Sequence, residues 1–342
     1  MNMLPHAHMF DLNAAPAVMK PALVDGHWVD PYIKNRSRMP TSLPAYPDVP
    51  DLHFLVSRVI NNPSVPEVAD VAFWRRRMTF EEAVNGIPNT VFGGLDMSTS
   101  VGYPRVLTGF TTKKAWFSDP VRSEQVRGEV YAKIALLQMG IRPLFLAMDV
   151  LKDERRTIEK VLTCSTRVVV VGPLDLLIIS RMFYGGYVAW SQLNRINNGH
   201  TVGMNPYSPE FDAMCRELLV GGFAQFGGDS ALFDMSQHPE HLRAIFAAIN
   251  DWYSDKDDRV RSILALDFMF ARHVTFPTTL GKAARDACLA EPLPASPLSV
   301  SDFLKMVNAS DNRDVLYVYI VVSGHPSGHY LTTVVNSDYS IS

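Results

Sequence analysis

The chain has 342 residues, a net charge of −3, 47% hydrophobic residues and 20% charged residues. This composition excludes a disordered or collagen-like chain and a uniformly basic nucleic-acid binder, although a local basic channel is compatible with it. At one domain per ~150 residues, the length predicts about two domains or lobes. The three cysteines, Cys164, Cys215 and Cys288, are far apart, which excludes a disulfide framework or zinc ribbon and favours a reducing intracellular setting.

The first 70 residues are rich in proline. Ten of the chain's 23 prolines fall there. Proline has no N–H to donate and restrains the residue before it, so this segment is predicted to be extended, with short helices at most. Its apolar residues Phe10, Trp28, Tyr32 and Phe54 indicate that it lies on another surface. No stretch of the sequence reaches the ~18 apolar residues of a membrane span, and the N-terminus lacks the pattern of a signal peptide.

Beyond residue 120, helical and strand patterns alternate, which predicts an α+β fold. Ser123 precedes a helical apolar series, Val126, Val130, Ile134 and Leu137, and Gly140 follows it, so we expect a capped helix there. The other predicted elements are a strand at 168–171, a helix at 173–193, a strand and turn at 223–234, a helix from Pro239 to Trp252, a charged turn at 254–259, a helix at 260–270, a loop at 281–301, a buried strand at 315–322 and a helix beginning near Ser327.

The segment TSVGYP at 99–104 places two hydroxyl groups ahead of a tight turn at Gly102. Such a turn could contact a phosphodiester backbone through hydroxyl and N–H groups, or it could be an ordinary surface turn. The segment KDERRTIEKVLTCSTR at 152–167 has five basic and three acidic residues, a local net charge of +2. Arginine forks on phosphate oxygens and lysine acts as a point charge, so this segment could grip a triphosphate; the alternative is a solvated charged loop.

The segment GGDSALFD at 227–234 carries two carboxylates. Asp229 is predicted at the end of an apolar strand, and Asp234 lies five residues later. A carboxylate at a strand end could hold a hard divalent cation, and the second could contact the same ligand elsewhere. The alternative is that both aspartates cap the turn and the following helix.

The segment SGHPSGHYLTTVVNS at 323–337 follows the last predicted strand. Ser327, Thr332 and Asn336 recur at intervals of five and four, so on a helix they could share a face and read a hydroxyl group. Polar helix capping is one alternative. A second is a serine nucleophile at Ser327, although the order is G-x-x-S-G rather than G-x-S-x-G. A third is zinc held by His325 and His329, but the residues between them form helix poorly, which favours packed or solvated histidines.

Taken together and in this order, the four segments resemble motifs G, F, A and B of the right-hand RNA-dependent RNA polymerases of picornavirus-like positive-strand RNA viruses, in particular the insect and marine groups. VGMNPYSPEFDAM at 202–214 is also similar to sequences of that family, and the resemblance covers about residues 90–342. It implies a right-hand fold with fingers, an incomplete palm and no thumb. The implied divisions are a finger extension at 1–89, fingers at 90–183, a first palm segment at 184–252, a finger insertion at 253–310 and a second palm segment at 311–342.

The resemblance also implies a role for each matching residue. Asp229 would bind the catalytic magnesium ions, which manganese could replace, and Asp234 would contact the ribose of the incoming nucleotide. Ser327, Thr332 and Asn336 would complete a pocket that prefers a 2′-hydroxyl. The triphosphate would be bound by Lys152, Arg156, Lys160 and Arg167, and the template strand would be guided by Thr99, Ser100 and Gly102. The implied mechanism is two-metal nucleotidyl transfer, in which the primer 3′-hydroxyl attacks the α-phosphate and pyrophosphate leaves.

One feature of the family is missing from this sequence. No Gly-Asp-Asp follows the second palm motif, and the sequence stops six residues after Asn336. We therefore expect a truncated, inactive fragment of a larger polymerase or polyprotein. A non-catalytic RNA-binding module, and less strongly a serine hydrolase using Ser327, are the alternatives. The expected partners are template and primer RNA, nucleoside triphosphates and other viral replication proteins, with a protein primer possible. The expected location is the host cytoplasm, at membrane-associated replication complexes reached through those partners.

Overall fold

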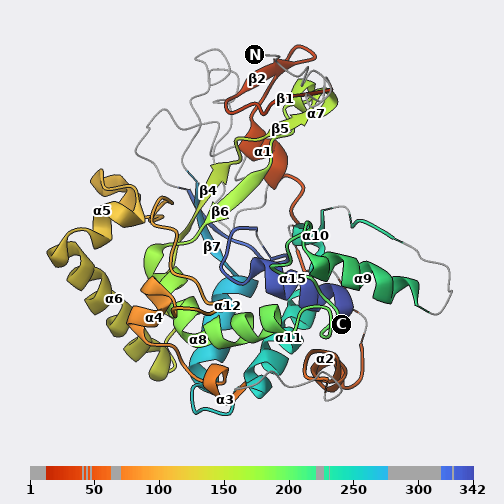
Figure 1. Ribbon diagram of the computed structural model, residues 1–342. Coiled ribbons are helices and arrows are strands. Elements are labelled where there is room, and N and C mark those ends of the chain that lie inside the picture. The colour runs from red at the N-terminus through yellow and green to blue at the C-terminus, as the bar shows by residue number, and fades with distance from the viewer. Residues whose placement is uncertain are drawn as a thin grey trace, which may run out of the picture. The chain divides into compact units, whose positions relative to one another are not determined.

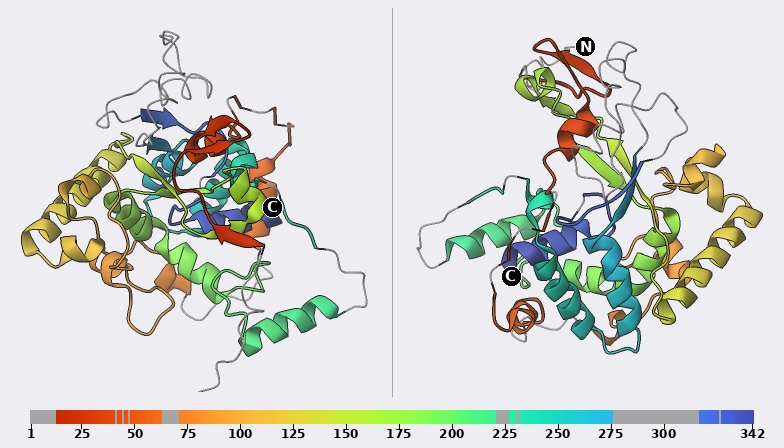
Figure 2. Two further views of the ribbon diagram at one scale, coloured as in Figure 1. Left: turned by 90° about the horizontal axis from the view of Figure 1, so that it is seen from above. Right: turned by 180° about the vertical axis from the view of Figure 1, so that it is seen from behind.

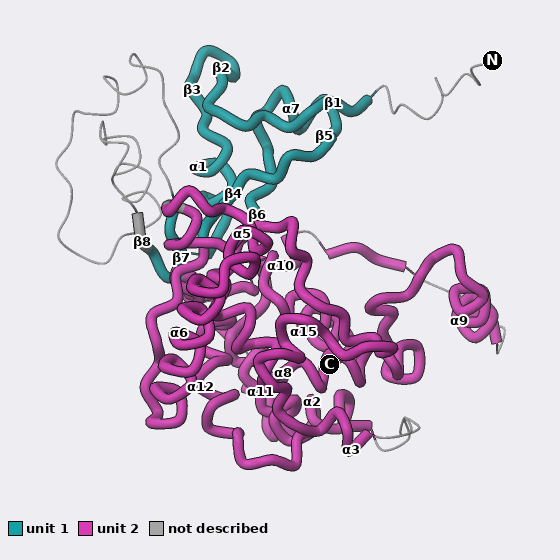
Figure 3. Tube along the Cα trace, turned by 60° about the vertical axis from the view of Figure 1, so that its left-hand side comes forward, with its two compact units in different colours: residues 1–41, 148–170, 273–320 teal, residues 42–147, 171–272, 321–342 magenta. Residues whose placement is uncertain are grey.

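The computed structural model describes residues 13–40, 42–43, 45–46, 48–62, 71–220, 227–230, 232–275, 317–325 and 327–342. The chain divides into two compact units, which Figure 3 colours separately. Unit 1 comprises residues 1–41, 148–170 and 273–320, and unit 2 comprises residues 42–147, 171–272 and 321–342. Each unit is therefore assembled from segments that are far apart in the sequence.

The strands lie in unit 1 or at its boundaries. A four-stranded sheet has the order β6-β4-β7-β8, and two further pairs are β1-β5 and β2-β3. The bounds are β1 Ala14–Pro16, β2 Ala22–Val24, β3 His27–Val29, β4 Ala147–Leu151, β5 Arg155–Thr157, β6 Val168–Val171, β7 Arg272–Thr275 and β8 Tyr317–Ile320. The strand predicted at 168–171 is confirmed as β6. Of the strand predicted at 315–322, residues 315 and 316 lie outside the described residues, and the exposed side chain of Ile320 shows that β8 is not buried throughout.

The proline-rich segment packs against other segments of this chain, as predicted from its apolar residues. In unit 1, β1 pairs antiparallel with β5, and β2 and β3 form a hairpin followed by the short helix α1 (Pro31–Arg36). In unit 2, the nine-residue helix α2 (Leu52–Ile60) packs against α11 (Pro239–Trp252). Two of the aromatic residues expected to be covered, Trp28 and Phe54, are exposed, because the segment buries other side chains; Phe10 lies outside the described residues.

Unit 2 is helical, and its core lies among α6, α8, α11 and α12 (Figure 1). In α6, the predicted apolar series is buried, but the helix begins one turn before Ser123. The Asp119 carboxylate caps the helix, because it accepts hydrogen bonds from the N–H groups of Val121 and Arg122. Pro120 at the first helical position also favours a helix start there, since it has no N–H that would need a partner. The remaining bounds are α3 Val71–Trp74, α4 Phe80–Asn85, the 3₁₀ helix Arg105–Thr108, α5 Lys113–Phe117, α6 Pro120–Gln138, α7 (in unit 1) Ile158–Leu162, α8 Leu174–Leu193, α9 Pro209–Leu219, α10 Phe233–Ser236, α12 Asp258–Met269 and α15 Thr332–Ile341.

The helices predicted at 173–193, 239–252 and 260–270 are confirmed as α8, α11 and α12. Of the strand and turn predicted at 223–234, residues 223–226 and 231 lie outside the described residues, residues 227–230 form no regular element, and α10 follows. The loop predicted at 281–301 also lies outside them. None of the residues of α9 is buried, and in Figure 2 this helix extends away from the other helices of unit 2. Of the helices that the structure describes, none has both the length and the apolar character needed to cross a bilayer.

Candidate functional site

The second carboxylate of the GGDSALFD segment meets the SGHPSGHYLTTVVNS segment inside unit 2. Asp234, on α10, accepts a hydrogen bond from the Ser327 hydroxyl, with 3.3 Å between Ser327 Oγ and Asp234 Oδ2. Both residues are half-buried, so the carboxylate keeps a face accessible to a ligand. Two segments that are 93 residues apart in the chain thus contribute polar groups to one place.

The main chain fastens these two segments together. The N–H of His325 donates to the carbonyl of Asp234 at 2.7 Å, and the N–H of Gly324 donates to the carbonyl of Gln237 at 2.8 Å. Gly324 has a φ of +99°, and a Cβ there would lie 2.5 Å from the Asp234 carbonyl oxygen. Only glycine therefore permits this close approach without displacement of the backbone. The loop geometry thereby sets the position of Ser327 relative to Asp234.

The helix after this loop begins later than predicted. α15 starts at Thr332 rather than near Ser327, because Gly328 has a φ of +121° and residues 327–331 form turns. The prediction that Ser327, Thr332 and Asn336 share a helix face was therefore wrong for Ser327, which lies in the turn. Thr332 and Asn336 do lie one helical turn apart on α15, as an i, i+4 pair on one face. Asn336 is joined to the α10 segment, because its Oδ1 accepts a hydrogen bond from Gln237 Nε2 at 2.8 Å.

Asp229 lies in the segment 227–230, whose residues are all exposed. The carboxylate oxygens of Asp229 are hard ligands of the kind that Mg²⁺ prefers. This ion is typically held by one or two carboxylates together with water and substrate phosphates. Within the described part of the chain, no group of three or more histidine, cysteine or acidic side chains could hold a metal ion. Of the residues in 227–230, Asp229 supplies one carboxylate of this kind.

The basic segment lies in unit 1 and is organised around one carboxylate. Glu154 contacts Lys152 at 2.9 Å, Arg156 at 3.3 Å and Arg167 at 3.5 Å. Partial burial raises the pKa of Glu154, but the hydrogen bond from Lys152 and the nearby positive charges outweigh it and lower the pKa overall. These three cations thus converge on one anionic group, which is the arrangement that a phosphate group would also attract.

Lys160 does not take part in this cluster. It lies on α7, beyond β5, and its side chain is exposed. Its role in binding a triphosphate stays a prediction.

A buried carboxylate organises the sheet of unit 1. Asp149, on β4, is bonded to Arg36 of α1, to His273 and Thr275 of β7, and to Tyr319 of β8. Burial raises the pKa of this carboxyl, but the charges of Arg36 and His273 and three hydrogen bonds hold it well below its usual range. The strand that leads into Lys152 is thereby tied to the N-terminal segment.

The TSVGYP segment lies in unit 2, and its polar groups are partly used within the protein. Lys113, which is almost fully buried, donates hydrogen bonds to the Thr99 hydroxyl and the Ser100 carbonyl. Gly102 has a φ of +69°, and a Cβ there would lie 2.5 Å from the carbonyl oxygen of Gly172. Gly102 therefore permits close packing of this turn against the start of α8. The role of Thr99, Ser100 and Gly102 in guiding a template stays a prediction.

The histidines of the last segment are packed. His325 is fully buried and His329 nearly so, and their ring centroids lie 6.2 Å apart. Burial lowers the pKa of His325 to about 4, so its ring is neutral at pH 7. Within the described residues, the Ser327 hydroxyl is bonded to a carboxylate and to no histidine, so the contacts do not form a serine–histidine pair.

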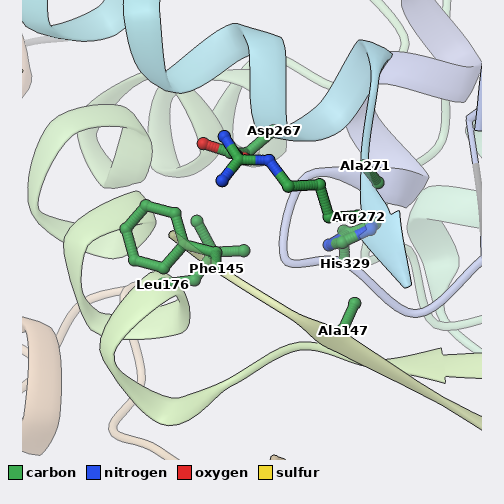
Figure 4. A pocket seen from close by; sticks show the side chains of 7 residues that line it. All are labelled: Phe145, Ala147, Leu176, Asp267, Ala271, Arg272 and His329. Atoms are coloured by element: carbon green, nitrogen blue, oxygen red, sulfur yellow. The ribbon is translucent and has the colours of Figure 1, made fainter. Parts of the chain in front are cut away.

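A small hollow beside these elements is not a substrate site. It is lined by Phe145, Ala147, Leu176, Asp267, Ala271, Arg272 and His329 (Figure 4) and leaves no room for a water molecule. Arg142 donates two hydrogen bonds to Asp267 Oδ1, at 2.7 and 3.0 Å, and the Arg272 guanidinium lies 3.8 Å from the same atom. The one carboxylate among the lining residues is therefore already paired with arginine side chains.

Sequence reasoning missed three residues that organise these sites. The sequence analysis singled out neither Gln237 nor Lys113, and it counted Glu154 only as a negative charge. No short pattern identifies them, because the partners of Gln237 and Lys113 lie 99 and 14 residues away.

Comparison with known proteins gives one family. The family model described as viral RNA-dependent RNA polymerase matches residues 15–340. The replicase polyprotein of acute bee paralysis virus is 28% identical over 288 residues, covering 79% of this chain and 14% of the polyprotein. The replicase polyprotein of cricket paralysis virus is 34% identical over 180 residues, covering 49% of this chain and 10% of the polyprotein.

The fold is also that of a solved polymerase. The Sicinivirus 3Dpol RNA dependent RNA polymerase superposes with a TM-score of 0.62 at 18% identity, over 98% of this chain and 61% of that chain. The sequence thus spans less than two thirds of these relatives. The fold is that of a right-hand polymerase, and the chain belongs to the viral RNA-dependent RNA polymerase family, with picornavirus-like replicases among its relatives.

Proposed function

We propose that this chain binds ribonucleoside triphosphates and RNA as part of RNA-templated RNA synthesis in viral genome replication. The observation that carries the proposal is the hydrogen bond between Ser327 and Asp234, beside a helix face that presents Thr332 and Asn336. Hydroxyl, carboxylate and amide groups in one place can read both the donor and the acceptor of a ribose hydroxyl. A 2′-hydroxyl is what distinguishes RNA precursors from DNA precursors.

The remaining roles follow from charge and position. Lys152, Arg156 and Arg167 already share an anionic partner, and a triphosphate would take the place of Glu154 as that partner, with Lys160 adding a further charge. Template RNA would contact Thr99 and Ser100 at the turn that Gly102 shapes.

Asp229 would supply one protein ligand to Mg²⁺, or to Mn²⁺, which accepts the same oxygen ligands. When bound, such ions favour attack of a 3′-hydroxyl on the α-phosphate and stabilise the departing pyrophosphate. Asp234 and Ser327 would meanwhile hold the ribose of the nucleotide. Positioning and electrostatic stabilisation of this kind account for most of the acceleration in such reactions.

The 342 residues contain no Gly-Asp-Asp sequence, so we propose that this chain by itself binds nucleotide and RNA without polymerising. That makes an RNA-binding module the second candidate for the isolated chain. We also propose that it works with template and primer RNA, a protein primer and other viral replication proteins, at membrane-associated replication complexes in the host cytoplasm.

Calorimetric titration of the purified chain with ATP and with 2′-deoxy-ATP, in Mg²⁺, tests the proposal. We expect tighter binding of ATP, and we expect Ser327→Ala to reduce that preference by about fivefold, the worth of one hydrogen bond. Arg167→Gln should weaken both ligands equally, because it acts on the triphosphate.

The matched control is Arg216→Gln on the exposed helix α9, where Arg216 contacts Asp212 at 2.9 Å. It should leave both affinities unchanged. Equal affinity of the wild-type chain for ATP and 2′-deoxy-ATP would contradict the ribose assignment. Template-dependent incorporation by the purified chain, abolished by Asp229→Ala, would contradict the proposal that it does not polymerise.

A further inference from the structure

Gln237 lies between the two segments that form the proposed ribose site. It follows the last residue of α10, three positions after Asp234, and its side chain is fully buried. Its carbonyl accepts hydrogen bonds from the N–H of Gly324 at 2.8 Å and from the Ser323 hydroxyl at 3.2 Å. The residue is therefore held at its main chain by the loop that leads to Ser327.

The side chain of Gln237 uses only its donor. Nε2 donates to Asn336 Oδ1 at 2.8 Å, whereas Oε1 is buried and has no hydrogen-bond partner among the residues that the structure describes. A buried acceptor without a partner is destabilising, so the amide is retained at a cost that an apolar residue of similar shape would avoid. What it provides in exchange is the donor to Asn336.

This donor determines which way the Asn336 amide faces. A side-chain amide has an acceptor oxygen on one arm and a donor NH₂ on the other. With Oδ1 engaged by Gln237, Nδ2 is directed elsewhere, and within the described residues no protein group accepts from it. Asn336 is half-buried on the helix face that also carries Thr332, so its NH₂ group is available to a ligand.

We infer that Gln237 is a positioning residue, which turns the Asn336 amide so that its NH₂ group donates to the 2′-oxygen of a bound ribonucleotide. The inference rests on the proposed function, because it assigns a ligand to the same site. Gln237 itself does not contact the nucleotide. Without its donor the Asn336 amide can rotate, and the preference for a 2′-hydroxyl is lost while the triphosphate and base contacts remain.

The test compares Gln237→Met and Gln237→Leu with the wild-type chain, titrated with ATP and 2′-deoxy-ATP. Both variants replace the amide by an apolar side chain of similar size and so remove the donor. We expect the ATP preference to fall by about fivefold, with the affinity for 2′-deoxy-ATP unchanged. The matched control is Ser340→Ala, which removes a 2.8 Å hydrogen bond to the Asn336 carbonyl on the same helix and should leave the preference intact.

A second measurement separates orientation from general loss of structure. In the ¹⁵N-labelled chain, the side-chain NH₂ signal of Asn336, identified by its absence in Asn336→Ser, should shift with ATP and not with 2′-deoxy-ATP. This selective shift should disappear in Gln237→Met. If the wild-type chain discriminates and both Gln237 variants discriminate equally well, the role of Gln237 is wrong and the proposed function stands. If the wild-type chain binds no ATP, the proposed function fails, and the role of Gln237 fails with it.

Discussion

Replacing Asp338 by asparagine should stabilise unit 2 at pH 8 far more than at pH 5. Asp338 lies on α15, two residues after Asn336, and is only 1% exposed. Its Oδ2 accepts a hydrogen bond from the Tyr187 hydroxyl at 3.1 Å, and its Oδ1 lies 3.9 Å from His200 Nε2. Burial raises the pKa of Asp338 to about 7, and the hydrogen bond from Tyr187 lowers it only in part.

The direction of the effect follows from proton binding. An aspartate has a pKa of 3.8 when unperturbed, so the folded chain holds a proton on Asp338 between about pH 4 and pH 7 that the unfolded chain has lost. The contribution of Asp338 to the free energy of unfolding is therefore fully present below about pH 4. It is lost as the pH rises through the folded-state pKa of about 7. About two units of this interval lie between pH 5 and pH 8, and each unit is worth ~1.4 kcal/mol, so the wild-type chain should lose ~3 kcal/mol from this group.

His200 titrates in an overlapping range with the opposite sign. Burial lowers its pKa to about 4, so its contribution to stability grows as the pH rises from about 4 towards the 6.5 of an unperturbed histidine. The stability of the wild-type chain alone would mix the two effects. The difference between Asp338→Asn and the wild type isolates the carboxyl group, because His200 is present in both.

Urea unfolding at pH 5 and pH 8, followed by tryptophan fluorescence, measures this difference. The rings of Trp190 and Trp252 each lie 5.5 Å from the Tyr187 ring, so they report on the surroundings of Asp338. The advantage of Asp338→Asn should grow by ~3 kcal/mol between the two pH values. In Tyr187→Phe, loss of the hydroxyl should extend the pH-dependent loss above pH 7. A difference that is constant from pH 5 to pH 8 would refute the reasoning.

Three further outcomes are expected. Gly102→Ala should lower the unfolding temperature more than Gly109→Ala. Both glycines have a positive φ, but of the two only Gly102 lies where a Cβ would meet backbone, 2.5 Å from the Gly172 carbonyl oxygen. Equal shifts in unfolding temperature would show that this contact relaxes freely. Glu154→Gln raises the net charge of the basic segment from +2 to +3, so RNA binding at low salt should tighten. The slope of the logarithm of the binding constant against the logarithm of the salt concentration should steepen by about 0.7. Filter binding at several salt concentrations measures this slope, and an unchanged slope would show that the segment does not contact RNA. Asp149→Asn should destabilise unit 1 by about 3–5 kcal/mol, because it breaks a buried ion pair, and should expose residues 13–41 to limited proteolysis; an unchanged cleavage pattern would contradict this.

The sequence by itself determined the type of five of the eleven elements described in residues 120–275, namely α6, β6, α8, α11 and α12, whereas the strands β4, β5 and β7 were not predicted. Apolar residues at helical spacing predict α8, α11 and α12, because a helix in a core must bury one face and these residues mark it. The β-branched run of β6 predicts a strand for a similar reason. Motif order was informative as well, since the four weak segments together gave the polymerase family that comparison confirmed.

Sequence patterns predicted the ends of helices less reliably than their interiors. The cap of α6 lies at Asp119 rather than Ser123, and α15 begins at Thr332 rather than near Ser327. In both places several residues could have served as the boundary. The choice depended on which side chain reached the free N–H groups and on which glycine adopted a positive φ.

Only the tertiary structure decided which polar groups meet. The sequence placed Asp234 and Ser327 in neighbouring motifs, but their contact depends on a loop held by Gly324 against α10. Gln237 could not be found by spacing, because its partner lies 99 residues away and its role depends on which arm of an amide is occupied. Glu154 was visible as a charge, yet its contact with three cations arises only when the neighbouring strands β4 and β6 bring Lys152 and Arg167 together. The spacing of apolar residues predicts which face of a helix or strand is buried. The partner of a buried polar group, in contrast, depends on how elements that are distant in sequence pack together.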